Sequence, residues 1–124
     1  MPESLVFLKR RDDYVAVASF GRKSVMPGFI LQARQRPSGN LPSGGIRVGI
    51  TATRKIGGAV VRNRAKRRLR ALSRELMPEN AMSGHDFVLI ARGTTPAIPY
   101  ASLRADLLQA LRKLGLLNAG GSVP

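Results

Sequence analysis

Residues 54–74 read RKIGGAVVRNRAKRRLRALSR, and the interpretation of the whole chain starts from them. They hold nine of the 21 basic residues of the 124-residue chain and no acid. Apolar side chains recur here at steps of three or four residues and predict a helix with one narrow buried stripe, formed by Val61, Ala65, Leu69, Leu72 and Leu76. The rest of this helix is basic, so we expect one edge to pack on a core and the remainder to face outward.

The outward side of the predicted helix carries dense positive charge. Opposite the stripe lie Asn63, Lys66, Arg67, Arg70 and Arg74, with Arg62 on one flank and Arg64 and Arg68 on the other. Like charges four residues apart destabilise an isolated helix by roughly 0.2–0.5 kcal/mol per pair. A solvated face is one interpretation; a face that docks on a polyanion is favoured, because neutralised phosphates release counterions.

Two features of this stretch each allow two interpretations. The Asn63 amide can donate to and accept from a sugar or base edge, or it is an inert exposed side chain. Gly57 and Gly58 let a nucleic-acid backbone approach the first-turn N–H groups, or they form a tight turn between strand and helix.

Composition limits the function classes. A formal charge of +14 favours a nucleic-acid partner over a membrane, since no basic helix also carries bulky aromatic anchors. The chain has no cysteine, which excludes disulfides and thiolate metal sites, and its N-terminus lacks the pattern of a secretory signal. We expect a cytoplasmic protein with one RNA-binding domain over residues 1–117 and a disordered tail over 118–124.

The remaining elements follow from periodicity and turn residues. Asp12 or Asp13 is expected to cap a short helix that ends at Gly21, and Pro27-Gly28 to connect two strands. A polar loop over residues 34–45 leads to an alternating strand at 46–52, and the basic helix is expected to end near Met77-Pro78. A central strand at 86–92 and an amphipathic helix at 100–114 complete an α+β two-layer sandwich with a four-stranded mixed sheet, in the order αβββαβα.

The sequence also suggests roles for several single residues outside the basic helix. Arg34 and Arg36 either approach bound RNA from the polar loop or have no role. Gly49 either leaves a shallow place where a nucleic-acid strand crosses the sheet or marks a bulge. His85 has no second His or Cys nearby in sequence and is interpreted as a loop residue.

The motif resembles the signature of the bacterial ribonuclease P protein family. The resemblance rests on the Arg54-Lys55 pair, the Gly57-Gly58 turn, Ala59-Val60, Arg62-Asn63-Arg64, and Lys66-Arg67 with a further arginine at 70, and it extends over residues 8–114. It implies that the crossover through the basic helix is left-handed, although such crossovers are ordinarily right-handed.

The resemblance also implies a function. Members of the family bind the large catalytic RNA of ribonuclease P through the Arg-Asn-Arg helix and hold the single-stranded 5′ leader of precursor tRNA between the first helix and the sheet. The RNA subunit then hydrolyses the phosphodiester bond with Mg²⁺, leaving a 5′ phosphate on the tRNA. We expect no DNA or membrane partner.

Site residues carry over by position. The catalytic-RNA block corresponds to Arg62, Asn63, Arg64, Lys66, Arg67, Arg68 and Arg70, and the leader cleft to Tyr14, Arg54, Lys55 and Arg92. Ala18 and Gln32 stand where relatives often carry aromatic side chains, so weaker leader stacking is expected. Phe20 either supplies the missing ring or, as favoured here, belongs to the core.

No catalytic residue is assigned. Seven acids are scattered through the chain, whereas a two-metal nuclease needs carboxylates that converge on ions about 4 Å apart. The two other hypotheses are a different basic RNA-binding module, such as a ribosomal protein, and a self-sufficient metal-dependent nuclease.

Overall fold

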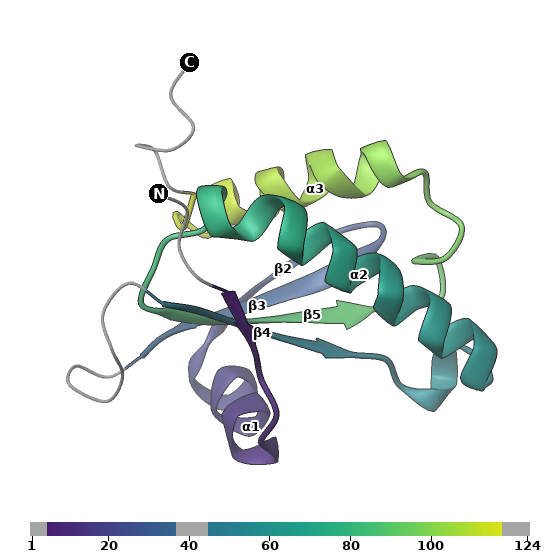
Figure 1. Ribbon diagram of the computed structural model, residues 1–124, viewed down its shortest axis with the longest axis horizontal. Coiled ribbons are helices and arrows are strands. Elements are labelled where there is room, and N and C mark those ends of the chain that lie inside the picture. The colour runs from purple at the N-terminus through teal and green to yellow at the C-terminus, as the bar shows by residue number, and fades with distance from the viewer. Residues whose placement is uncertain (1–4, 37–44, 118–124) are drawn as a thin grey trace.

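Three helices cover a five-stranded mixed sheet in the computed structural model, which describes residues 5–36 and 45–117 (Figure 1). The elements are β1 (Leu5–Phe7), α1 (Arg11–Phe20), β2 (Arg22–Val25), β3 (Phe29–Gln35), β4 (Ile46–Thr51), the 3₁₀ turn η1 (Arg54–Ile56), α2 (Ala59–Asn80), β5 (His85–Ala91) and α3 (Tyr100–Lys113). Helix α1 lies on one face of the sheet, and α2 and α3 lie on the other. The α+β class is confirmed, but helices cover both faces instead of one.

The sheet has the strand order β1-β4-β5-β3-β2. Strand β4 is parallel to β1 and to β5, and the β5-β3 and β3-β2 pairs are antiparallel. The four-stranded prediction missed β1, because three residues are too few to show periodicity and their partner lies about forty residues further along, with Leu5 opposite Ile46. Helix α2 connects the adjacent parallel strands β4 and β5, and the hand of this crossover stays a prediction.

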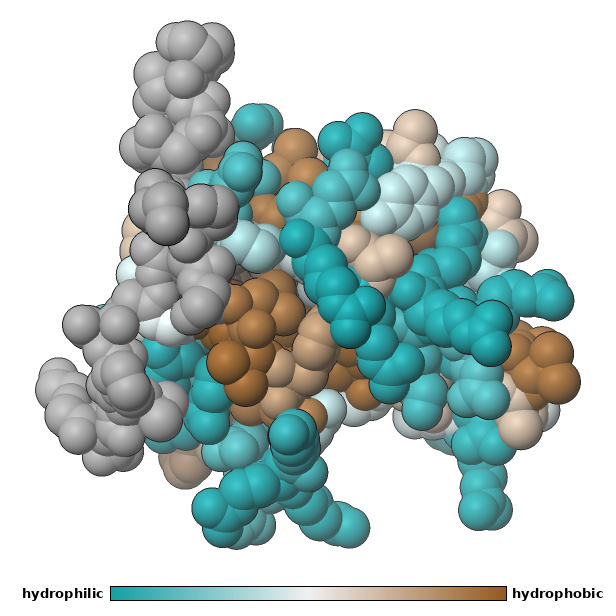
Figure 2. All heavy atoms as spheres, viewed as in Figure 1, coloured by the Kyte–Doolittle hydropathy of each residue, from teal (hydrophilic) through white to brown (hydrophobic). Residues whose placement is uncertain are grey.

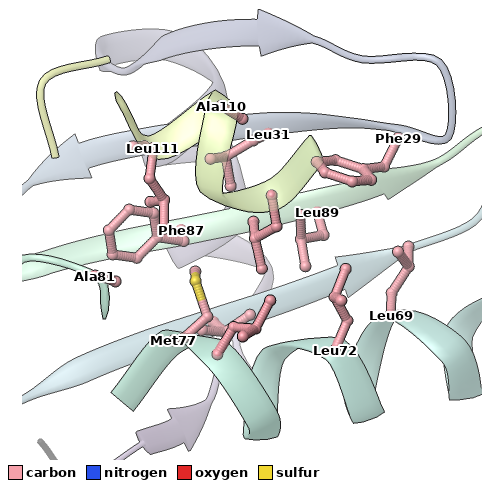
Figure 3. Packing of buried hydrophobic residues seen from close by; sticks show 14 of the residues in the cluster. Phe29, Leu31, Leu69, Leu72, Met77, Ala81, Phe87, Leu89, Ala110 and Leu111 are labelled. Carbon is pink, nitrogen blue, oxygen red and sulfur yellow. The ribbon is translucent and has the colours of Figure 1, made fainter. Parts of the chain in front are cut away.

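The larger core lies between the sheet and the pair α2 and α3. Figure 3 shows Leu69, Leu72 and Met77 of α2 directed toward Phe87 and Leu89 of β5. The predicted stripe of α2 is thus confirmed, except that Val61 is only half-buried. The amphipathic helix expected at 100–114 is confirmed as well, because the leucines at helical spacing are buried, namely Leu103, Leu107 and Leu111 of α3 and Leu114 directly after it.

Two helix boundaries differ from the prediction. Helix α2 continues through Pro78 to Asn80. A proline in the last turn costs the helix only one backbone N–H donor, and the carbonyls at the helix end accept other hydrogen bonds. The Asn80 side chain donates to the Leu76 carbonyl at 2.8 Å. Helix α1 begins at Arg11 and has no side-chain cap, so neither Asp12 nor Asp13 is the N-cap. Both lie in the first turn, where their negative charge interacts favourably with the helix dipole.

Some expectations concern residues outside the described ranges. They are the disordered tail over 118–124 and most of the polar loop after β3. In the described part of the chain, no helix is both long and apolar enough to cross a bilayer.

Candidate nucleic-acid interface

The outer side of α2 presents the basic residues that the sequence placed there. Figure 2 shows hydrophilic side chains gathered along this helix. Asn63, Arg64 and Arg67 are exposed, and Arg62, Lys66, Arg68 and Arg70 are half-buried. The ion pairs found among the described residues involve Arg36, Arg47 and Arg104 and none of the α2 cations. The charge of this face is therefore available to an external polyanion.

Arg68 is the exception within this block. Its Nη1 donates to the carbonyls of Thr95 and Pro96 at 2.8 and 2.9 Å, and its guanidinium lies 6.0 Å from the centroid of the Tyr100 ring. Arg68 therefore ties α2 to the loop between β5 and α3. The sequence placed this side chain on a flank of the helix but carried no signal that a loop about 27 residues later would lie against it.

The two glycines before α2 differ in why glycine suits each position. Gly57 has a backbone φ of +146°, which residues with a side chain rarely adopt, so glycine is needed here for the tight turn. Gly58 has an ordinary φ of −74°, and an added Cβ would meet nothing within 4 Å. The backbone at Gly58 is thus open to a ligand. Beside it, the Arg62 Nε is buried and has no hydrogen-bond partner among the described residues.

A groove of about 310 Å³ lies on the opposite face, between α1 and the sheet. We call it the leader groove, after the role that the family resemblance implies for this position. Its lining comes from Arg11, Tyr14, Val15 and Ala18 of α1 and from Gln32, Thr51, Val88 and Ile90 of the sheet. The floor is largely apolar, and Arg11 is the one cation among these lining residues. Aromatic and apolar surfaces beside cations suit a single strand, whose bases stack while its phosphates are neutralised.

The predicted leader residues converge at one edge of the sheet. Tyr14 lines the groove itself. Arg54 and Lys55 are exposed in η1, directly after β4, and Arg92 is exposed directly after β5. Because the carboxyl ends of adjacent parallel strands meet at the same sheet edge, these cations lie at the end of the groove marked by Thr51 and Ile90. Arg92 also has a structural contact, since its Nη1 donates to the Met26 carbonyl at 2.6 Å.

Gly49 forms the seat of the Tyr14 ring. A Cβ at position 49 would lie less than 3.0 Å from ring carbons of Tyr14. The Tyr14 hydroxyl donates to the Leu8 carbonyl at 3.3 Å, which fixes the ring from its other end. The expectation of an open shallow place at Gly49 is therefore wrong, because α1 brings an aromatic side chain onto that position.

The residues that depart from the family pattern lie where the resemblance placed them. Ala18 and Gln32 both line the groove and present no ring to it. Phe20 is not in the groove, and the core interpretation favoured by the sequence is wrong, because this side chain is 75% exposed. The Arg34 guanidinium lies 5.4 Å from the centroid of its ring.

A buried ion-pair network stands beside the groove and was missed by the sequence analysis. The Asp86 side chain, 1% exposed, accepts from Arg47 Nε and Nη2 at 2.8 and 2.6 Å and from Arg36 Nη1 at 3.0 Å. Arg47 also reaches Asp13 of α1 at 3.4 Å. Arg36, expected either near RNA or without a role, thus has a buried structural role.

The network shifts the pKa values of its members. Burial by itself raises the pKa of the Asp86 carboxyl, but hydrogen bonds from Arg47 and Arg36 outweigh burial, so the pKa lies below its usual value. The hydrogen bond to Asp86 in turn raises the pKa of the Arg47 guanidinium.

Next to this network, His85 is the first residue of β5 and is buried, so the loop interpretation of His85 is wrong.

This fold and this site define a basic α+β protein with a cationic helix on one face and a strand-sized groove on the other. Comparisons with known proteins specify it further. The family model described as Ribonuclease P matches residues 3–115. The ribonuclease P protein component of Paramagnetospirillum magneticum is 44% identical over 111 residues, which is 90% of this chain and 84% of that protein. The corresponding protein of Gluconacetobacter diazotrophicus is 45% identical over 112 residues, covering 90% and 93%.

Solved structures agree in fold. The RNase P protein of Staphylococcus aureus superposes with a TM-score of 0.71 at 20% identity, over 90% of this chain and 97% of that one. The RNase P protein of Thermotoga maritima gives a TM-score of 0.67 at 25% identity, over 82% and 91%. The chain belongs to the ribonuclease P protein family.

Proposed function

We propose a division of roles within ribonuclease P, the enzyme of which this chain is a protein component and which cleaves tRNA precursors. The outer face of α2 binds the catalytic RNA subunit, and the leader groove holds the single-stranded 5′ leader of precursor tRNA. One observation carries the proposal: α2 exposes Arg64 and Arg67 while no acid of the described chain forms an ion pair with any α2 cation. Such a face gains stability only when an external polyanion meets it.

The two surfaces lie on opposite faces of the sheet, which supports simultaneous contact with two RNA segments. Helix α2 rests on the face of Val48 and Ile50, and α1 with the groove lies on the face of Gly49 and Thr51. The open approach at Gly58 gives the catalytic RNA an entry at the start of α2, where a phosphate oxygen can accept hydrogen bonds from the first-turn N–H groups.

The chemistry is assigned to the RNA subunit. Within residues 5–36 and 45–117, no three or more His, Asp or Glu side chains gather in a way that would hold a metal ion. Three of the acids already have cationic partners: Asp13 and Asp86 pair with Arg47, and Glu75 pairs with Arg104. These donor sets do not fit a protein-bound catalytic ion, and we propose that Mg²⁺ is bound mainly by RNA.

The same proposal places the chain in the cytoplasm, where tRNA precursors of a bacterial cell are made, with no DNA or membrane partner. The β4-α2-β5 crossover is proposed to be left-handed, as the family resemblance implies.

The test compares binding of the catalytic RNA at several salt concentrations. The double variant Arg64→Ala with Arg67→Ala should weaken binding. It should also make the negative slope of log K against log salt shallower, by about 0.7–0.9 for each lost phosphate contact. Arg112→Ala, which removes an exposed arginine from α3, is the matched control and should leave both quantities unchanged. Equal affinity of the double variant and the control would refute the role given to α2.

A further inference from the structure

A second hollow lies beside the exposed ring of Phe20. It measures about 320 Å³, and its lining includes Phe20, Arg22, Arg34, Gln35 and His85. The groove residues Tyr14, Val15 and Ala18 lie on one flank of α1, whereas Phe20 follows Ala18 by two residues, a turn of about 200° around the helix axis. The hollow is therefore distinct from the leader groove, and it lies at the C-terminal end of α1, where Phe20 is the last residue of the helix.

The side chains of the hollow are those that recognise a nucleotide. Phe20 offers an exposed aromatic face, and the Arg34 guanidinium already lies 5.4 Å from its centroid. Arg22 is held in place because its Nη2 donates to the Leu114 carbonyl at 2.6 Å. Among the described residues, two arginines line the hollow and no acid does. A base stacks on such a ring, and guanidinium groups bind the adjoining phosphate.

The backbone of β3 adds hydrogen-bonding capacity at the same place. The ladder between β2 and β3 starts with Arg22 opposite Ala33 and does not reach Arg34 or Gln35. These two residues pair with β5 on their other side, opposite Asp86 and His85. Beyond Ala33 the edge of β3 is thus not paired with β2, and the backbone groups that point to this side have no ladder partner among the described strands.

We propose that this hollow binds leader nucleotides of precursor tRNA that lie beyond those in the leader groove, with a base stacked on Phe20 and a phosphate on Arg34. The inference rests on the proposed function of the groove. Gln32 in the groove and Arg34 in the hollow point to the same face of β3 and are two residues apart, about 6–7 Å along the strand. A single strand that leaves the groove past the end of α1 therefore reaches Phe20 directly.

The experiment measures the affinity of the assembled holoenzyme for precursors whose leaders are lengthened one nucleotide at a time. The wild type should gain affinity when the leader first fills the groove and again when it reaches the hollow. Phe20→Ala should lose only the second gain, by about 5- to 100-fold, and Phe20→Tyr should retain it. Arg34→Ala should lose part of the same gain and lower its salt dependence.

Controls separate this inference from its alternatives. Met82→Ala removes another exposed apolar side chain and should behave like the wild type at every leader length. Thermal unfolding checks that Phe20→Ala stays folded, as expected for an exposed side chain.

Three outcomes would overturn the inference. In the first, Phe20→Ala equals the wild type with every leader; in the second, no second gain exists. In the third, Phe20→Ala weakens binding of the free catalytic RNA, which would place the hollow in that interface. None of these results affects the first gain, on which the role proposed for the leader groove depends.

Discussion

Replacing Gly49 with alanine is expected to displace Tyr14 from the wall of the leader groove. The new Cβ would lie less than 3.0 Å from carbons of the ring, and neither partner can yield easily. Strand β4 is fixed between β1 and β5, where Val48 pairs with Phe7 and with Phe87. The ring is a rigid plane on α1, so relief requires that the ring rotate into the groove or that α1 lift from the sheet.

The cost follows from this overlap. Inserting one methyl group into a packed site destabilises a protein by about 1–3 kcal/mol. In a Tyr14→Ala background the space of the ring is vacated, and the same methyl should then change the free energy of unfolding by less than about 0.5 kcal/mol. The predicted coupling energy between positions 14 and 49 is therefore about 1–3 kcal/mol.

Urea denaturation of the wild type, both single variants and the double variant measures this coupling. Gly93→Ala is the matched control, because a Cβ at that position would meet nothing within 4 Å. Affinity for the leader should fall in Gly49→Ala together with stability. If Gly49→Ala costs the same with and without the Tyr14 ring, the proposed seat of the ring is refuted.

Three further predictions concern the network, α2 and the groove. Asp86→Asn leaves buried arginine charge without its partner and should lower stability by about 3–5 kcal/mol near neutral pH. The folded-state pKa of Asp86 is lowered, so its contribution to stability is fully present above the unfolded pKa of about 3.9 and is lost as pH falls through the folded pKa. Measured by urea denaturation at decreasing pH, the difference in stability between Asp86→Asn and the wild type should therefore close in that range. Arg68→Ala should lower stability by about 1–3 kcal/mol through its lost bonds to carbonyls, while Arg64→Ala leaves the urea midpoint unchanged; an unchanged midpoint for both would contradict the tie between α2 and the loop after β5. Gln32→Tyr should tighten holoenzyme binding of precursor tRNA about 5- to 100-fold and leave binding of mature tRNA unchanged, and equal gains for both RNAs would count against stacking in the groove.

The periodic elements were predictable because their signals are local. Alternation in β4 identified which side chains face the core, and the stripe of α2 identified Leu69 and Leu72 as buried. The basic face of α2 followed from the same spacing, since positions opposite a buried stripe are exposed on any amphipathic helix. The family resemblance, not periodicity, supplied Tyr14, which lines the groove, and Arg92, which lies at its end.

The misses share a physical cause, which is that each depends on a partner distant in sequence. Arg36 looked like a loop cation until Asp86, fifty residues later, was placed beside it. Phe20 is apolar and follows Val17 at helical spacing, yet no described element covers its ring, which is 75% exposed.

The sequence by itself determined that this chain is a basic α+β protein with one cationic helix, because charge and periodicity are properties of neighbouring residues. Only the tertiary structure decided which cations face outward and which are bound internally, and where a single strand can lie. Those outcomes depend on how α1, β4 and β5 meet, and packing between distant segments leaves no periodic trace in the chain. Arg68 and Gly49 are the clearest examples: a loop 27 residues away engages the first, and an aromatic ring from α1 fills the space above the second.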